Sequence, residues 1–196
     1  MLIDRRQFLA SGAALAVAGP ALLQTPAYAA DGPILTDDGL YKEPWFLDSF
    51  MVLPEDLAAA QKDGKRFVVM WELKGCPYCK ETHFVNFARP DIADYIKANF
   101  VVEQLNIIGL KTVTDFDGEE LTEKAMARKY GVQFTPTFQF FGEDAARLKT
   151  LAPQAREVAR APGYFRPDDF LAMFRFVREK AYETKSFRDF LKARAS

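Results

Sequence analysis

Cysteine and histidine are scarce in this sequence: its 196 residues include two cysteines and one histidine. Cys76 and Cys79 are so close in the chain that a bridge between them removes little entropy from the unfolded state, which excludes a fold held together by disulfides. A zinc site of the usual kind is also excluded, because there is no second cysteine pair and His83 is the single imidazole. We expect no metal, and a core built from the 49% of residues that are hydrophobic.

An excess of charge of either sign is absent as well. Lys and Arg number 26 and Asp and Glu number 27, for a formal net charge of −1. Nucleic acids and anionic membranes attract basic surfaces, and this balance offers none. The length suits one domain with a sizeable core, and no internal repeat divides the chain. We expect partners that are recognised by shape and chemistry, and no binding of nucleic acid.

Hydrophobic runs are short except at the N-terminus. Arg5-Arg6 precede an alanine-rich run at 10–23, and Ala27 and Ala29 are the small residues expected before a cleavage site. We therefore expect residues 1–29 to be a removable signal sequence, with export to the periplasm and a mature chain beginning at Ala30. The paired arginines indicate the twin-arginine route. The alternative is a general secretory signal in which the arginines only supply charge.

The rest of the chain alternates strand and helix patterns. Residues 30–40 are small and polar and predict a mobile lead-in, followed by a domain over 41–196. The segment 107–120 predicts an exposed hairpin or loop with a solvated turn at Asp117-Gly118. Hydrophobic periodicity, proline and glycine predict helices at 54–61, 76–87, from 90, 121–130, from 167 and 186–194, and strands at 67–71, 100–105, 132–141 and 147–151.

The two cysteines lie where thiol chemistry is favoured. The segment 74–80 leaves the predicted buried strand and opens a helix, which places Cys76 at the helix N-terminus, where free N–H groups and the helix dipole stabilise a thiolate. Pro77 suits the first helical turn, and the three-residue offset brings the Cys79 sulfur back to Cys76. We predict that Cys76 attacks a partner disulfide and that the shielded Cys79 resolves the mixed disulfide.

A second signal is a helix ending in Tyr130-Gly131-Val132, followed by Thr135-Pro136-Thr137 and an alternating apolar strand. This arrangement resembles the stretch of the thioredoxin family that carries its cis-proline, and the likeness spans Lys65 to Leu151. It implies an α/β fold, with one thioredoxin-like domain, a central mixed sheet flanked by helices, a short insertion and an extra C-terminal helix. It also implies a cis Thr135-Pro136 bond that faces the cysteines and lines a groove for extended partners. The alternative is an ordinary edge-strand proline.

Closer details resemble periplasmic thioredoxins of the SoxW type, which accompany sulfur-oxidation systems. They are the segment 75–83, the insertion at 115–123 and the Pro162-Gly163-Tyr164-Phe165 lead into a phenylalanine-rich helix. The resemblance implies a monomer that reduces disulfides in periplasmic proteins, such as a sulfur-carrier or a cytochrome-assembly protein. It implies re-reduction by a membrane electron donor, and no cofactor besides the Cys76–Cys79 disulfide.

Two departures from ordinary thioredoxins lie near the cysteines, one in the active-site loop formed by Pro77, Tyr78 and Lys80 and one on the preceding strand. The Pro77-Tyr78 dipeptide is that of glutaredoxins, and Met70 replaces the buried acid six residues before the first cysteine. Glu72 shares a strand face with Met70 and is a candidate proton acceptor for Cys79; the alternative is an exposed strand-end carboxylate.

His83 lies one helical turn after Cys79 and is a second candidate for proton handling. A satisfied histidine under the helix is the favoured interpretation. Lys80 and Lys74 are candidates to favour the thiolate, although solvated lysines are the default.

The function predicted from these residues is an exported thiol–disulfide oxidoreductase that works as a reductase. The first alternative keeps the fold and reverses the electron flow, which makes the protein an oxidant or isomerase. The second is a non-enzymatic binding module that senses redox state. The potential of the Cys76/Cys79 couple and turnover with a disulfide substrate separate these three functions.

Overall fold

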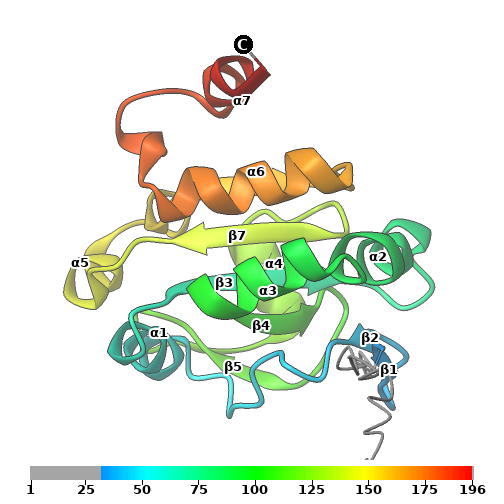
Figure 1. The fold of residues 1–196 in the computed structure, drawn as a ribbon. Coiled ribbons are helices and arrows are strands. Elements are labelled where there is room, and N and C mark those ends of the chain that lie inside the picture. Colours follow the sequence, from blue (N-terminus) through cyan, green and yellow to red (C-terminus); the bar gives the residue numbers. More distant parts are fainter. Residues whose placement is uncertain (1–31, 196) are drawn as a thin grey trace, which may run out of the picture.

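The computed structural model describes residues 32–195, so the predicted signal sequence at 1–29 lies outside the described residues. Figure 1 shows a sheet with helices on both sides. The elements in chain order are β1 (Ile34–Leu35), β2 (Tyr41–Lys42), α1 (Leu53–Lys62), β3 (Arg66–Glu72), α2 (Pro77–Glu81), the π-helix η1 (Thr82–Phe87), α3 (Pro90–Asn99), β4 (Phe100–Asn106), β5 (Thr112–Thr114), β6 (Glu120–Thr122), α4 (Glu123–Lys129), β7 (Thr137–Phe141), α5 (Ala145–Thr150), η2 (Pro153–Arg156), β8 (Glu157–Pro162), α6 (Pro167–Arg178), η3 (Ala181–Glu183) and α7 (Phe187–Ala195).

The central sheet has four strands in the order β4-β3-β7-β8. Strand β3 runs parallel to β4 and antiparallel to β7, and β8 pairs antiparallel with β7. The apolar run predicted as a buried strand is the core of β3, which is buried along its whole length. A mixed sheet flanked by helices is the fold class expected from the sequence, and that prediction is confirmed.

Alternate residues of β3 face two separate hydrophobic clusters. Val68 and Met70 pack with α3, α6 and α7, whereas Phe67 and Trp71 pack with α1, α4 and α5. Helix α6 therefore lies against one face of the sheet, as Figure 1 shows. Glu72 follows Met70 by two positions and shares its face of the sheet, as the strand period requires.

The strand predicted at 147–151 is wrong: residues 145–150 form helix α5. The Asp144 carboxylate accepts a hydrogen bond from the Arg147 N–H at 3.0 Å, which caps a helix at its first turn. The sheet edge is instead β8, where Phe138 is paired with Ala161.

The segment 30–40, expected as a mobile lead-in, contributes the first strand of a β-hairpin whose second strand follows it. Strand β1 pairs antiparallel with β2, and we call residues 33–43 the N-terminal segment.

The insertion forms the antiparallel hairpin β5–β6 and is less exposed than expected. Asp115 lies between the two strands and is buried. Its carboxylate accepts hydrogen bonds from the Tyr130 hydroxyl at 2.6 Å and from Arg156 at 2.7 Å, which compensate for the loss of water.

Candidate active site

The loop that carries the cysteines begins where β3 ends. Gly75 has a φ of 76°, a left-handed conformation that glycine adopts without strain, and it turns the chain from the strand into α2. Cys76 is the N-cap of α2 and Pro77 is the first helical residue. The helix predicted to begin at Cys76 continues through η1, so the chain from 77 to 87 is helical but changes its hydrogen-bonding pattern at Thr82.

The two thiols have different environments. Cys76 is half-buried, whereas Cys79 is 3% exposed. The Cys79 N–H donates to the Cys76 sulfur at 3.2 Å, which places a backbone donor where negative charge forms on Cys76. Burial raises the pKa of the Cys79 thiol, and both its hydrogen bond with Cys76 and the negative charge of Glu72 raise it further. Cys76 is therefore the accessible sulfur, and Cys79 is held as a thiol.

The proline loop lies against the accessible sulfur. The Thr135-Pro136 peptide bond is cis. The Cys76 sulfur is 3.4 Å from the Thr135 carbonyl oxygen, and the Thr135 hydroxyl donates to the same sulfur at 3.4 Å. The fold thus brings together two segments about sixty residues apart, Cys76 and Thr135, as the sequence predicts.

An apolar groove runs beside this contact, and we call it the aromatic groove. Its volume is about 590 Å³, and it is lined by Tyr78, Phe134, Thr135, Pro162, Gly163 and Tyr164. The rings of Tyr78 and Tyr164 stack with centroids 6.1 Å apart, and Phe134 is 65% exposed. Exposed aromatic side chains next to a reactive sulfur provide a surface on which a protein partner can dock.

A second groove lies on the side of the N-terminal segment, and we call it the hairpin groove. It has a volume of about 560 Å³ and lies between residues 35–41 and 72–80. Glu72, Cys76 and Cys79 all line it. The groove therefore lies next to the accessible Cys76 sulfur, with the buried Cys79 and Glu72 in its wall.

Glu72 is neither exposed nor alone. It is 1% exposed, and its carboxylate lies 3.2 Å from the Nε2 atom of His83, which is itself fully buried. Nδ1 of the same ring lies 2.8 Å from a carboxylate oxygen of Glu43. Burial opposes charge on the ring, but the hydrogen bonds to Glu43 and Glu72 outweigh it and raise the pKa of His83 to about 9. His83 is thus the satisfied histidine that the sequence favours, and Glu72 is not the exposed strand-end carboxylate of the alternative.

A family model described as a thioredoxin-like domain matches residues 53–178. The chain belongs to the thioredoxin-like domain family. No curated protein matches it.

Solved structures similar to this thioredoxin-like domain include a thioredoxin-fold protein from Helicobacter pylori, with 24% identity, a TM-score of 0.53 and coverage of 76% of this chain and 86% of that chain. A thioredoxin from Thermus thermophilus is 28% identical, with a TM-score of 0.47 and coverage of 64% and 83%. The oxidised C-terminal domain of DsbD from Neisseria meningitidis is 15% identical, with a TM-score of 0.42 and coverage of 66% and 96%. The first likeness supports the fold, and this fold is consistent with thiol–disulfide chemistry.

Two residues of this thioredoxin-like domain lie at the site without having been predicted from the sequence. Glu43 comes from the N-terminal segment, forty positions before His83. Gln104 on β4 donates from Nε2 to the Glu72 carboxylate and, at 2.6 Å, to the Tyr41 carbonyl oxygen. No pattern in the sequence marks either residue, because each contacts its partner across more than thirty positions of the chain.

The lysines beside the cysteines have other contacts. The Lys80 ammonium lies over the Phe84 ring, 5.7 Å from its centroid. The Lys74 side chain packs against Gly39, where a Cβ atom would stand 2.8 Å from the lysine Cδ. Lys74 thus joins the cysteine loop to the N-terminal segment.

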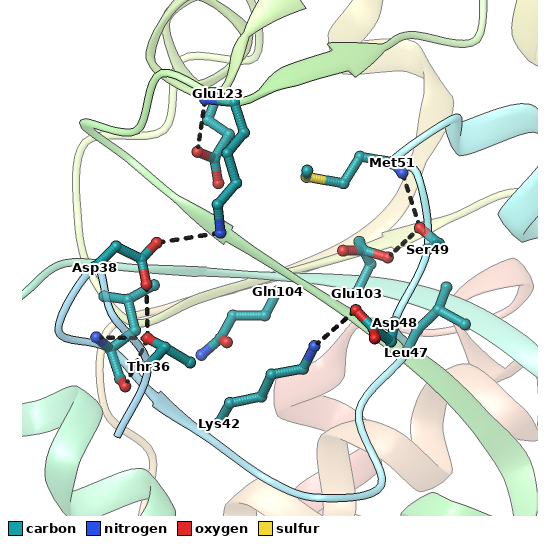
Figure 2. Close-up of a pocket in the computed structure, with 12 residues that line it drawn as sticks. Thr36, Asp38, Lys42, Leu47, Asp48, Ser49, Met51, Glu103, Gln104 and Glu123 are labelled. Atoms are coloured by element: carbon teal, nitrogen blue, oxygen red, sulfur yellow. Dashed lines mark hydrogen bonds and ion pairs between the residues drawn. The ribbon is translucent and has the colours of Figure 1, made fainter. Parts of the chain in front are cut away.

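A separate polar pocket lies below the N-terminal segment and is drawn in Figure 2. There the Ser49 hydroxyl lies 3.0 Å from Glu103 and 3.1 Å from Asp56, and accepts a hydrogen bond from the Met51 N–H at 2.9 Å. Burial raises the pKa of Glu103 to about 8 and that of Asp56 to about 6.

Two further findings apply to the part of the chain that the structure describes. Among residues 32–195, no group of three or more histidine, cysteine or acidic side chains is arranged to hold a metal ion. Within the same range, none of the helices has the length and apolar character needed to cross a membrane.

Proposed function

We propose that the chain is an exported thiol–disulfide oxidoreductase that reduces disulfides in periplasmic proteins through Cys76 and Cys79. The observation that carries the proposal is the asymmetry of the two thiols. Cys76 is accessible and contacts the Thr135 loop, while Cys79 is buried behind it. A nucleophile at the surface with a resolving thiol beneath it is the arrangement that exchange through a mixed disulfide requires.

The reaction proceeds in two exchanges. The Cys76 thiolate attacks one sulfur of a partner disulfide, so a Cys76–partner bond forms and the other partner sulfur leaves as a thiolate. Cys79 then loses its proton and attacks Cys76, which releases the second partner sulfur. The partner gains two electrons and two protons as a dithiol, and the chain is left with a Cys76–Cys79 disulfide. A separate reductant, which we place at the membrane, restores the dithiol.

The aromatic groove and the Thr135 loop support a protein as the substrate. An extended segment can lie beside Cys76, with apolar side chains against Phe134 and Tyr164. The further assignment to sulfur-carrier or cytochrome-assembly partners rests on the SoxW resemblance. The location in the periplasm rests on the sequence at 1–29.

The test uses Cys79→Ser, which keeps the nucleophile and removes the resolving thiol. Partners should accumulate on Cys76 as mixed disulfides in periplasm that contains the variant, and Cys76→Ser should trap far less because Cys79 is buried. Equal trapping by both variants would contradict the assignment of Cys76. Trapping by neither would favour a redox-sensing binding module.

The potential of the couple decides the direction of electron flow. A reductase should lie well below the value of about −120 mV that a strong oxidant has, in the region of about −200 to −270 mV. A potential near that of a strong oxidant would instead assign the protein to disulfide formation.

A further inference from the structure

The three side chains Glu43, His83 and Glu72 form one buried row, which we call the acid–histidine group. Each ring nitrogen of His83 faces a carboxylate oxygen, Nδ1 toward Glu43 at 2.8 Å and Nε2 toward Glu72 at 3.2 Å. All three side chains are buried. The ring lies among aromatic neighbours, with its centroid 5.8 Å from that of Phe46 and 5.5 Å from that of Phe87.

The hydrogen bonds fix how many protons this group holds. An ionised carboxylate only accepts hydrogen bonds, and a neutral imidazole has one N–H and one bare nitrogen. A bare ring nitrogen and a carboxylate oxygen both accept, so both contacts of the ring are hydrogen bonds only if a second proton is present beyond that of a neutral ring. That proton lies either on the ring, as an imidazolium between two carboxylates, or on one of the acids. The raised pKa of His83, about 9, favours the ring.

We propose that Glu43 is a positioning residue that keeps this proton on His83, so that Glu72 faces Cys79 as an empty proton acceptor. The proposal rests on the proposed function, because a proton acceptor matters only if Cys79 resolves a mixed disulfide. In that step the Cys79 proton passes to Glu72, the Cys79–Cys76 bond forms and the partner sulfur leaves with the electron pair of its bond to Cys76. Glu43 itself touches no reacting atom.

The hairpin groove provides the path for the proton. Glu72, Cys76 and Cys79 all contribute to the wall of this cavity of about 560 Å³, which is large enough to hold water beside the two buried groups. The charge of Glu72 is also one of the causes that raise the pKa of Cys79. The carboxylate is thus electrostatically coupled to the thiol from which it takes the proton.

Glu43 belongs to the N-terminal segment, whose position places the Glu43 carboxylate next to His83. Gln104 ties the segment to Glu72, since its amide group donates both to the Tyr41 carbonyl oxygen and to the Glu72 carboxylate. The other titratable neighbours are Tyr41, whose ring lies 6.2 Å from that of His83, and Cys79 itself. None of these is a cation, so Glu43 and Glu72 are the groups that favour charge on the ring.

The first experiment measures the protonation of the His83 ring by NMR. Because His83 is the single histidine of the chain, its ¹⁵N signals are unambiguous in a tag-free protein. The wild-type ring should stay doubly protonated through pH 8. In Glu43→Gln, which keeps the shape and removes the charge, the titration should move down by at least about one pH unit, and Glu43→Asp should restore part of the shift. Glu120→Gln, an exposed acid of β6, is the matched control and should leave the titration unchanged.

The second experiment follows resolution in a single turnover, starting from a mixed disulfide on Cys76. The wild-type rate should be nearly flat between pH 6 and 8. In Glu43→Gln the proton spends time on Glu72, so resolution should be about tenfold slower near pH 6.5 and should recover as the pH rises. The first attack by Cys76 should keep its rate.

An unchanged His83 titration in Glu43→Gln overturns the proposal, and so does an unchanged pH profile of resolution when the titration has moved. Failure of the proposed function has a different signature. In that case Cys79→Ser traps no partner, whereas the ring titration still reports on Glu43.

Discussion

Replacing Glu103 by glutamine should remove much of the pH dependence of this protein's stability. Glu103 is 4% exposed, and its carboxylate accepts a hydrogen bond from the Ser49 hydroxyl at 3.0 Å (Figure 2). That hydroxyl has one proton, already accepts the Met51 N–H and also lies 3.1 Å from Asp56. One hydroxyl proton cannot hydrogen-bond to two carboxylates at once, and burial together with the charge of Asp56 raises the pKa of Glu103 to about 8, which keeps a proton on that acid at neutral pH.

The direction and size of the change in unfolding free energy with pH follow from the raised pKa of Glu103. A buried acid with a raised pKa binds its proton more tightly in the folded state. Its contribution to stability is complete below the ordinary value of 4.5 and is lost as the pH rises to about 8. At about 1.4 kcal/mol for each pH unit, the upper limit of the loss in unfolding free energy is on the order of 5 kcal/mol. In Glu103→Gln the amide cannot ionise, and this loss should disappear.

Urea unfolding at intervals from pH 5 to 9 measures the effect. His83 loses its own stabilising proton between 6.5 and about 9, but it does so in both proteins and cancels from the difference. Glu120→Gln, a change at an exposed acid, should leave the pH dependence of the unfolding free energy as it is in the wild type. If Glu103→Gln also shows the pH dependence of the wild type, Glu103 does not hold a proton at neutral pH.

Two further predictions concern the insertion and the aromatic groove. Arg156→Met should lower the unfolding free energy by about 3 kcal/mol, because it removes one of the two cations, Arg156 and Lys129, that pair with the buried Asp115 carboxylate. Adding Asp115→Asn should recover part of this loss, and additive losses in urea unfolding would contradict the explanation. Phe134→Ala should change stability by less than about 0.5 kcal/mol, since the ring is exposed, but should lower kcat/KM for a protein disulfide several-fold. An equal loss with a small-molecule disulfide would rule out a docking role for the ring.

Local pattern was enough to predict the parts of the site that lie within one element. The apolar run of β3, the turn into α2 and the strand parity that places Glu72 on the face of Met70 follow from residue order alone. The pattern at 147–151 predicts a strand where α5 forms, because so short an apolar run fits either structure and Asp144 caps the helix just before it.

The contacts of the acid–histidine group lie beyond any local pattern. Glu43 meets His83 across forty positions, and Gln104 meets Glu72 across thirty-two. No helix or strand period links such residues, so only the assembled fold identifies Glu43 and Gln104. The sequence could name Glu72 and His83 as candidates because both lie near the cysteines in the chain.

The place of the acid on β3 has a physical consequence for proton transfer. Met70 is buried in the cluster that contains Phe138 and Phe170, where an acid would have no polar partner and no route to solvent. Two residues further along the same face, Glu72 reaches the end of the strand, where His83 and Gln104 hydrogen-bond to it and the hairpin groove opens. In the role that we propose, a carboxylate at this position accepts the proton of Cys79. The N-terminal segment walls this groove and supplies Glu43, so the proposal makes the proton chemistry of the resolving thiol depend on residues outside the 53–178 range of the family match.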